Sequence, residues 1–487
     1  MLFCVTALAI GLRAIAQPIA PDGWDGVGFV ESVTDFDLAA FRPHPPGYPL
    51  FVALARLAHV LGLSPLRAVY AVSLVFGALL PLAGYGLVMR AMRSADARLC
   101  ATLAAMALAC APGCVVAGEA TIPDGAALTL AVAAYAAALG PYDASRARAL
   151  PHPPSDRASA LTGLLVAASL GVRPSALLVA LPALLLVPAI HRARGALVAA
   201  LTCALGVASW AVPIACIVGA SRWWALCRAQ LSGHLSRWGE SDASWSGTSG
   251  KTTAISEALS LQTLGIEGRL AASVALLLLA ALAAWAIALL LRRRTRAPFI
   301  AIVLCLPYAI AASFTQPVAA APRHALPITV AVIVAVALCA STLRARRAFS
   351  PALLSFALAS TAVVVALFVR GLAAARTHAE APAAVAMLRF VAHSAELAHA
   401  AVVSGRSSRF VAWGDGAIVA PGALAGDAIV FAMRADPLPD PLLVTSELDL
   451  RGVRAPRLQQ IATFFRDSPL DRREREITLY SLSVLPK

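Results

Sequence analysis

Apolar stretches of roughly 20 residues recur along almost the whole of residues 1–370. An α-helix needs about this length to cross the hydrocarbon core of a bilayer. The first apolar stretch is 1–20, and further spans are predicted at about 67–89, 98–117, 125–140, 158–171, 174–190, 196–220, 267–291, 298–316, 325–343 and 349–370. The pattern therefore predicts an all-α polytopic membrane protein with about eleven transmembrane helices.

Three apolar segments are too short for a simple crossing. We interpret 158–171 and 174–190 as a tilted hairpin that turns at 171–175, with Arg173 either at the outer surface or in a buried polar pocket. Segment 50–63 places Arg56 and His59 on one helical face and four leucines on another. This pattern predicts an amphipathic helix that lies in the outer membrane interface.

Clusters of arginine follow every even-numbered predicted span, from the second to the tenth. Basic loops are retained on the cytoplasmic side, so one topology satisfies all five clusters, with the N-terminus inside and the C-terminal tail outside. Positions 14–16 resemble a signal-peptide cleavage site, but a basic n-region is missing. Segment 1–20 is therefore interpreted as an uncleaved first transmembrane helix.

The chain divides into a transmembrane domain, 1–371, and an extracytoplasmic tail, 372–487, whose composition is that of a soluble domain. Within the first part, 21–66 and 221–266 are predicted to be large outer loops. In the tail, Leu388, Val391 and Ala395 recur at helical spacing, and short β-prone runs occur at 401–403, 410–413, 428–431 and 477–480. A small α/β domain is predicted.

Composition excludes several classes of protein. The chain is 60% hydrophobic and only 14% charged, which is unlike a soluble globular protein. Its net charge of +14 comes from arginines between apolar segments, without the interleaved aromatic residues that stack on bases, so nucleic-acid binding is excluded. The nine cysteines include no C-x-x-C pair and predict neither a zinc site nor a disulfide framework. Gly250 to Thr252 resembles a phosphate loop, but Trp245 stands where that motif needs glycine.

The first outer loop is unusually acidic. Five of the 26 acidic residues in the chain lie within 16 positions: Asp22, Asp25, Glu31, Asp35 and Asp37. Prolines at 45, 46 and 49 follow, and because proline fixes φ, they set where the interfacial helix begins. A carboxylate near the membrane surface can act as a general base toward a hydroxyl when its surroundings tune its pKa. A solvated acidic loop is the alternative.

Two other outer segments carry candidate side chains. Glu119 and Asp124 follow the third predicted span, on the same side as the first loop. Arg323 and His324 precede the tenth span, and Arg323 departs from the inside bias of the other arginines. The planar guanidinium group is well suited to phosphate because it donates two parallel hydrogen bonds and keeps its charge. Simple anchoring at the membrane interface is the alternative for both segments.

These segments resemble those of a known family. The acidic first loop ending in His-Pro-Pro-Gly-Tyr-Pro at 44–49 resembles the membrane-embedded GT-C glycosyltransferases, particularly the protein O-mannosyltransferase-like and aminoarabinose-transferase-like branches. Gly-Val-Arg-Pro-Ser at 171–175 and Pro-Arg-His-Ala-Leu-Pro at 322–327 resemble later landmarks of its bacterial members. The resemblance covers most of 1–371. Two positions depart from it: Gly26 follows Asp25 where many relatives have a polar side chain, and His324 replaces the usual tyrosine.

The resemblance implies an inverting glycosyltransferase that moves a sugar from a polyprenyl-phosphate-linked donor to a protein, glycolipid or polysaccharide acceptor on the outer face. Asp25 would be the base that activates the acceptor, and Arg323 with His324 would bind the donor phosphate. The substrate-positioning residues would be Asp22, His44, Tyr48, Glu119 and Asp124. A divalent cation is the only cofactor considered, with His44, Glu119 and Asp124 as candidate ligands.

A multi-pass transporter or lipid flippase is the main alternative. Such proteins place charged or broken helices near the bilayer midplane and often contain internal repeats. Here the predicted spans are almost free of ionisable groups, with Arg173 an ambiguous exception, and no repeat is found. A family member that binds a lipid-linked sugar without transferring it is a third possibility. The alanine- and arginine-rich composition favours a bacterial plasma membrane.

Overall fold

A computed structural model describes residues 1–15, 17–92, 97–140, 156–236, 247–291, 297–315, 318, 321–344, 351–397, 400–403, 442–446, 457–466 and 475–483. The α-helices are α1 (Leu2–Ala14), α2 (Gly23–Glu31), α3 (Pro49–Val60), α4 (Pro65–Met92), α5 (Ala97–Cys110), α6 (Pro112–Ala117), α7 (Asp124–Ala138), α8 (Asp156–Val172), α9 (Leu177–Ala180), α10 (Ala183–Val218), α11 (Ala220–Ser236), α12 (Gly247–Leu264), α13 (Arg269–Leu291), α14 (Ala297–Thr315), α15 (Leu326–Arg344), α16 (Pro351–His378) and α17 (Ala383–His393). Two 3-10 turns are η1 (Pro174–Ala176) and η2 (Pro322–Ala325).

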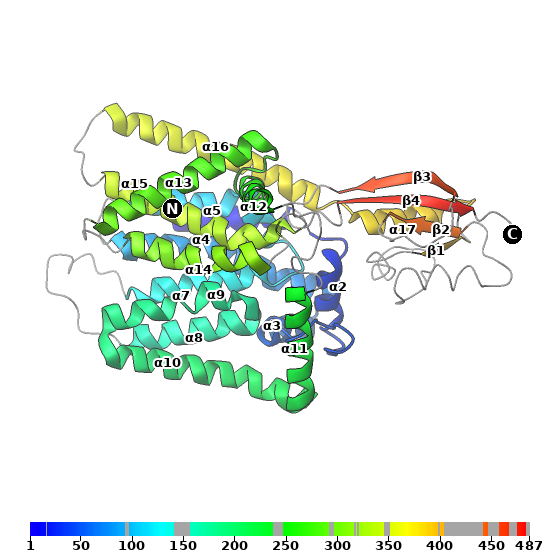
Figure 1. Cartoon of the computed structure of the whole chain (residues 1–487), viewed down its shortest axis with the longest axis horizontal. Coiled ribbons are helices and arrows are strands. Elements are labelled where there is room, and N and C mark those ends of the chain that lie inside the picture. The colour runs from blue at the N-terminus through cyan, green and yellow to red at the C-terminus, as the bar shows by residue number, and fades with distance from the viewer. Residues whose placement is uncertain are drawn as a thin grey trace.

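The apolar helices form a bundle in which long neighbours lie side by side (Figure 1). Helix α10 packs on α8, α8 on α7, α7 on α4, and α4 on α5. Small residues dominate the buried faces of α5 and α7, which lets the helix backbones approach closely. The largest cluster of buried apolar side chains runs through these helices and continues into α14 and α15.

Four stretches of the described chain are long and apolar enough to cross a membrane: Pro65–Met92, Ala193–Val218, Pro322–Ser341 and Ala359–His393. Other apolar helices are shorter, among them α1, α5 and α7. A membrane location agrees with this pattern, while the number of spans, about eleven, stays a prediction. The arginines at 93, 146, 148, 292–294, 296, 346 and 347, on which the predicted topology partly depends, lie outside the described residues.

The helix boundaries differ from the predicted ones at two places. Proline at position 112 divides the predicted span 98–117 into α5 and α6, because proline has no backbone N–H to continue the ladder. In contrast, α10 continues without interruption across 191–195, where the sequence predicts a loop between two spans. The arginines in that segment are good helix formers, so a charge cluster can mark a membrane surface without ending a helix.

Both predicted outer loops contain helices. Helix α3 begins at Pro49, as the proline pattern predicts, and it exposes Leu54 and Leu57; Leu61, which directly follows the helix, is exposed as well. Its placement in the membrane interface stays a prediction. Segment 221–266 is largely helical, formed by most of α11 and by α12, rather than an irregular loop. Trp245, which stands where a phosphate loop needs glycine, lies outside the described residues.

The tail combines α17 with a four-stranded sheet in the order β1-β2-β4-β3. The strands are β1 (Ala401–Val403), β2 (Leu442–Thr445), β3 (Arg457–Phe465) and β4 (Glu476–Ser483). Strands β1 and β2 are parallel, and β4 is antiparallel to both of its neighbours. The predicted helix and the strands at 401–403 and 477–480 are confirmed, whereas the predicted strands at 410–413 and 428–431 lie outside the described residues.

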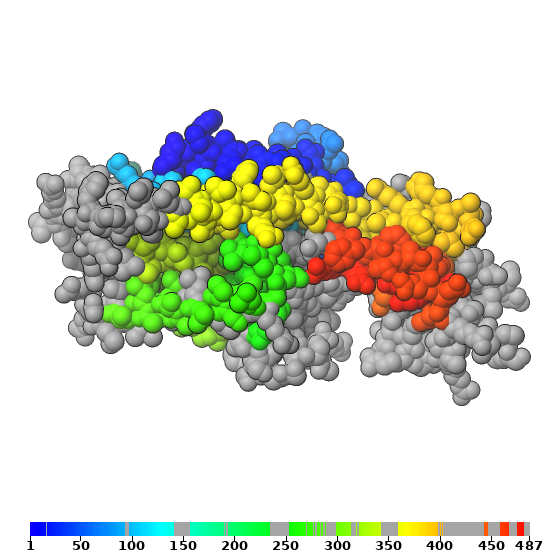
Figure 2. Space-filling model, turned by 90° about the horizontal axis from the view of Figure 1, so that it is seen from above, coloured from blue at the N-terminus to red at the C-terminus, as the bar shows by residue number. Residues whose placement is uncertain are grey.

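Helix α16 joins the two parts. It runs over the bundle and leads into α17 and the strands (Figure 2). The predicted domain boundary at 371–372 falls inside this helix, which continues to His378. The boundary stays a prediction, but the helix carries the chain from the bundle to the tail without a break in its hydrogen bonding at that point.

A fully buried arginine forms hydrogen bonds to both helices at the interruption between α5 and α6. Arg13 of α1 donates hydrogen bonds to the carbonyls of Ala109, at the end of α5, and Cys114, in α6. The last carbonyls of a helix have no hydrogen-bond donor within the helix. Arg13 therefore donates to carbonyl oxygens that would otherwise lack a donor where the helix is interrupted. Arg13 lies in the first apolar segment, so it is a second ionisable group, besides Arg173, in spans that the sequence predicts to be almost free of them.

Glycines make room for this arginine. A Cβ atom on Gly77 of α4 would lie 2.7 Å from the Cα of Gly118 and 2.8 Å from Nε of Arg13. We expect Gly77→Ala to destabilise the protein by about 1–3 kcal/mol through overpacking. Gly86→Ala in the same helix is the matched control, since nothing lies within 4 Å of its added Cβ. Unfolding in detergent measures both, and an equal shift for the two variants would contradict this packing.

Candidate active site

Asp25 lies on a short helix that its own sequence supports poorly. Helix α2 has nine residues, three of which are glycine, and it begins after Asp22. Each glycine costs a helix about 1 kcal/mol relative to alanine, and isolated helices shorter than about 12 residues are marginal in water. Asp25 in the first turn is favourable for the helix dipole. Even so, α2 must depend mainly on contacts with the rest of the protein.

Asp25 forms an ion pair with Arg323 of η2. Nη2 of Arg323 donates to Oδ2 of Asp25 at 2.5 Å, and Nδ1 of His44 lies 3.6 Å from the other carboxylate oxygen. The Asp25 side chain is 29% exposed, so the pair is reachable from outside. Burial alone would raise the pKa of Asp25, but the charges of His44 and Arg323 outweigh it and hold that pKa well below its usual range.

Tyr48 orients His44. The hydroxyl of Tyr48 lies 2.5 Å from Nε2 of His44, and both rings pack edge-on against Phe29 of α2. Tyr48 is buried and burial raises its pKa, so it remains a neutral hydroxyl. Gly47 and Tyr48 both have positive φ, which directs the chain into α3 at Pro49. The His-Pro-Pro-Gly-Tyr-Pro segment thus folds to present an imidazole to Asp25.

A second ion pair lies beside the first. Arg173, which precedes η1, donates to the Asp124 carboxylate at the start of α7. Burial alone would lower the pKa of Arg173, but Asp124 raises it, so the guanidinium remains charged. Of the two placements that the sequence left open for Arg173, the buried polar pocket is correct: only 17% of its side chain is exposed.

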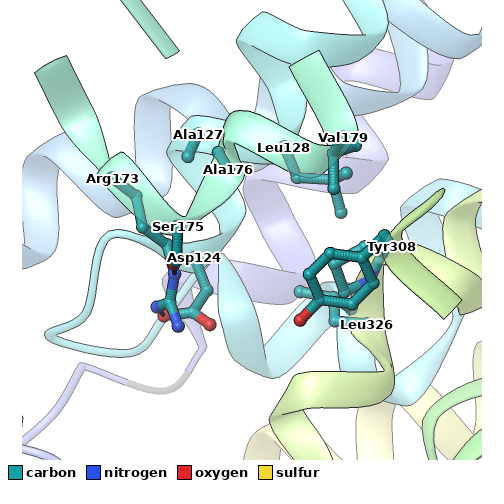
Figure 3. A pocket seen from close by; sticks show the side chains of 10 residues that line it. Asp124, Ala127, Leu128, Arg173, Ser175, Ala176, Val179, Tyr308 and Leu326 are labelled. Carbon is teal, nitrogen blue, oxygen red and sulfur yellow. Dashed lines mark hydrogen bonds and ion pairs between the residues drawn. The ribbon is translucent and has the colours of Figure 1, made fainter. Parts of the chain in front are cut away.

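This pair closes one end of a small cavity (Figure 3). The cavity has a volume of about 20 Å³, and its other end is lined by apolar side chains of α7, α9 and α15. Tyr308 of α14 lines the cavity and donates its hydroxyl hydrogen to the carbonyl of His324. This space suits roughly one water molecule. A larger ligand that enters here therefore requires side chains to move.

Asp22 and Glu119 lie behind these pairs rather than among them. Asp22 is buried and contacts Thr121, His378 and Arg466. Glu119 is fully buried, and Arg13 is its main electrostatic partner. The structure thus brings together Asp25, His44, Tyr48, Arg323 and Asp124 at one end of the bundle. The predicted roles of Asp22, Glu119 and His324 in positioning substrate or donor stay predictions, and their burial favours structural roles.

The candidate cation ligands do not form a common site. The described residues include no group of three or more His, Cys, Asp or Glu side chains that could hold a metal ion. Asp124 pairs with Arg173, and His44 faces Asp25. Cations already neutralise these carboxylates, so the side chains described do not fit the divalent cation considered from the sequence.

The sequence does not predict several groups that hold the site. Asp22 is contacted by three residues from distant segments, Thr121, His378 and Arg466. Glu119 has Arg13 as its electrostatic partner. None of these residues stands in a motif. The one available signal was a basic residue inside the first apolar segment, since an ionisable group inside a span is functional or paired by default.

The architecture matches known membrane glycosyltransferases. No family model and no curated protein sequence matches the chain. The structure of ArnT from Cupriavidus metallidurans bound to undecaprenyl phosphate is similar, with a TM-score of 0.54 over 98% of this chain and 96% of that one, at 12% identity. The chain has a GT-C fold. The oligosaccharyltransferase of Archaeoglobus fulgidus in the apo form gives a TM-score of 0.51 at 13% identity, over 91% of this chain and 69% of that one.

The resemblance of this chain to the GT-C glycosyltransferases, predicted from the sequence, is therefore confirmed at the level of the fold. Similarity at such low identity does not carry function or residue roles, because one fold hosts many activities. The roles of the residues depend on the contacts and charges of the site in this chain. Gly26, which departs from the family pattern, has a local reason: a Cβ atom there would lie 2.5 Å from Oγ1 of Thr121.

Glu119 provides a pH test of the buried carboxyl groups. Burial raises the pKa of Glu119 well above its usual range, against the opposing charge of Arg13. A raised pKa stabilises the fold below the unfolded value, and this contribution is lost as the pH rises through the folded value. We therefore expect wild type to lose stability relative to Glu119→Gln as the pH rises above the usual range of a glutamate carboxyl group. Unfolding at several pH values measures this, with exposed Glu396→Gln as control. A difference that does not change with pH would contradict the raised pKa.

Proposed function

We propose that this GT-C protein transfers a sugar from a polyprenyl-phosphate-linked donor to an acceptor hydroxyl at the outer face of the membrane. The observation that carries the proposal is the contact between Asp25 and Arg323, which places a candidate base directly beside an anion-binding group. The similar ArnT structure holds undecaprenyl phosphate, a lipid of the proposed donor class. The acceptor would be a protein, a glycolipid or a polysaccharide.

The proposed reaction is a single displacement. The acceptor oxygen attacks the anomeric carbon from the face opposite the phosphate, and its proton goes to the carboxylate of Asp25. The bond between the anomeric carbon and the phosphate oxygen breaks, and the oxygen leaves with both electrons. The configuration of the sugar inverts. Arg323 stabilises the charge that grows on the departing phosphate, an electrostatic contribution of about 10²–10³ in rate for a well-placed donor.

The ion pair suggests how the base becomes active. A carboxylate whose pKa is held low by Arg323 and His44 is a weak base. A donor phosphate competes with Asp25 for the guanidinium group, because both are oxyanions suited to its fork. Once Arg323 turns to the phosphate, Asp25 loses a positive neighbour and its pKa rises. Binding of the donor would thereby raise the pKa of Asp25 and make its carboxylate a stronger base for the transfer.

Arg173 supplies a second permanent cation next to this site. Its charge also acts on Asp25, Tyr48 and Tyr308. The apolar side chains that line the cavity behind it offer a surface for the first part of a lipid chain. In the proposed mechanism, phosphate lies between two guanidinium groups while the lipid lies along the bundle. A bacterial plasma membrane with this face toward the exterior is the proposed location.

A transporter or lipid flippase remains the competing function. The buried Arg13 is a charged group inside the bundle, as transporters often have. However, its guanidinium donates to three backbone carbonyls, which favours a structural role. The described ion pairs of Arg173 with Asp124 and of Arg323 with Asp25 lie at helix ends instead of helix middles: Asp124 begins α7, and Arg323 lies in η2 directly before α15. This arrangement favours chemistry at a membrane surface.

The two central residues should fail in different ways. We expect Asp25→Asn to lower transfer by about 10²–10⁴ through loss of the base, yet to keep or tighten binding of polyprenyl phosphate, because Arg323 is released from its ion pair. Arg323→Gln should weaken donor binding as well as transfer. Purified protein, a panel of radiolabelled polyprenyl-phosphate sugars and a binding assay with undecaprenyl phosphate measure both properties.

Asp35→Asn is the matched control for the base. Asp35 lies in the same loop, but it is exposed and pairs with Arg42. This variant should transfer sugar at the wild-type rate. Full activity of Asp25→Asn would exclude Asp25 as the base. If no donor of the panel is bound or consumed while labelled lipid crosses the bilayer of proteoliposomes, the flippase alternative replaces the transferase.

A further inference from the structure

Helix α2 lies between two hydrophobic cores. Phe29 and Val30 pack into a cluster of the bundle together with side chains of α3 and α4. Val27, on another face of the helix, belongs to a different cluster, which otherwise consists of Ala20 and residues of α17 and the sheet. Val27 and Phe29 are both almost completely buried. The helix that carries Asp25 is therefore part of the core of the C-terminal domain as well as of the bundle.

Asp22 fixes the start of this helix. Its Oδ2 accepts from the backbone N–H of Thr121 at 2.9 Å, and its own N–H donates to the Thr121 hydroxyl at 2.7 Å. Its Oδ1 accepts from Arg466 at 2.7 Å and lies 3.2 Å from Nε2 of His378. Because Arg466 also donates to Nδ1 of His378, the ring proton is on Nε2, toward Asp22.

Both partners of Asp22 are buried and lie far from it in the sequence. Arg466 directly follows β3, is 6% exposed and donates to a residue 444 positions earlier. His378 ends α16 and is 1% exposed. Removing one partner of a buried ion pair is strongly destabilising, because it leaves an uncompensated charge. Loss of Arg466 is therefore expected to loosen α2, a helix that has little intrinsic stability.

A second arginine provides a built-in comparison. Arg475 precedes β4, and its backbone carbonyl accepts from the N–H of Arg466 at 2.8 Å, so the two arginines face each other across one hairpin. Arg475 reaches Glu267, between α12 and α13, at 3.0 Å. That pair is partly exposed, and exposed ion pairs contribute little to stability because water screens them. One hairpin thus touches the bundle twice, once at the helix of Asp25 and once away from it.

We propose that Arg466 and His378 are positioning residues, through which the C-terminal domain holds α2 and sets the place of Asp25 against Arg323. The proposal rests on the proposed function for its catalytic consequence. Asp25 is one helical turn from Asp22, so a loosened start of α2 displaces the carboxylate. Arg466 does not contact the reacting groups itself. Its loss acts on transfer through the geometry of the first loop.

The test compares Arg466→Gln with Arg475→Gln in the full-length protein. We expect Arg466→Gln to speed hydrogen exchange of the amides in 23–31 and to lower kcat by about 10–100-fold, the cost of a small misplacement at a reacting centre. Binding of undecaprenyl phosphate should stay within about twofold, because Arg323 and Arg173 remain in place. Arg475→Gln should leave exchange in 23–31 and kcat at wild-type values.

A conservative variant separates positioning from general damage. Arg466→Lys keeps the charge but loses the guanidinium fork, so it should recover part of kcat and of the protection of 23–31. If Arg466→Gln does not give folded protein, the same comparison is made with Arg466→Lys, which should show a smaller loss in the same two measurements. Equal effects of the changes at 466 and 475, or unchanged exchange in 23–31, would overturn the proposal.

Failure of the proposed function would show itself separately. Hydrogen exchange requires no substrate. If wild type transfers no sugar while Arg466→Gln still speeds hydrogen exchange selectively in 23–31, the transferase function is wrong. The conclusion that Arg466 holds α2 in place is then still supported. If wild type transfers sugar but Arg466→Gln loses donor binding to the same extent as kcat, Arg466 acts on the binding site as a whole, and the positioning role is wrong.

Discussion

The surroundings of Asp25 are organised by the cost of burying charge. Four buried or partly buried acids in this region each lie near a basic side chain from another part of the chain. The pairs are Asp22 with Arg466 and His378, Asp25 with Arg323, and Asp124 with Arg173, and Glu119 is buried near Arg13. Each pair joins segments that hydrophobic packing alone would leave free to slide, so the site and the packing around it are fixed together.

Hydrophobic periodicity and the positions of prolines predicted those helices and strands that depend mainly on local sequence. The start of α3 at Pro49, helix α17 and strands β1 and β4 follow from patterns of a few residues. Long-range partners were not predictable, because nothing in the surroundings of Arg466 indicates that it faces Asp22. The acids of the site were visible as an unusual local density of charge. Their separation into an accessible Asp25 and a buried Asp22 depends on tertiary contacts, which no spacing rule contains.

In the proposed mechanism, two demands on Asp25 conflict. A base must be ready to accept a proton, yet an acid beside two cations holds its charge too well for that task. The conflict disappears if the ion pair belongs to the resting protein alone and a phosphate exchanges with the carboxylate. A resting site that neutralises its own charges also explains why the neighbouring cavity has room for only about one water molecule. The small size of the cavity then reflects a closed state instead of a small ligand.

The contact between Asp22 and Arg466 has a consequence for biosynthesis. Asp22 and Arg466 lie 444 positions apart, so Asp22 is synthesised long before its partner. Until Arg466 has been made, α2, with its three glycines, lacks this contact and has little intrinsic helical stability. The position of Asp25 on α2 would therefore become fixed only after the strand that precedes Arg466 has been synthesised and has folded.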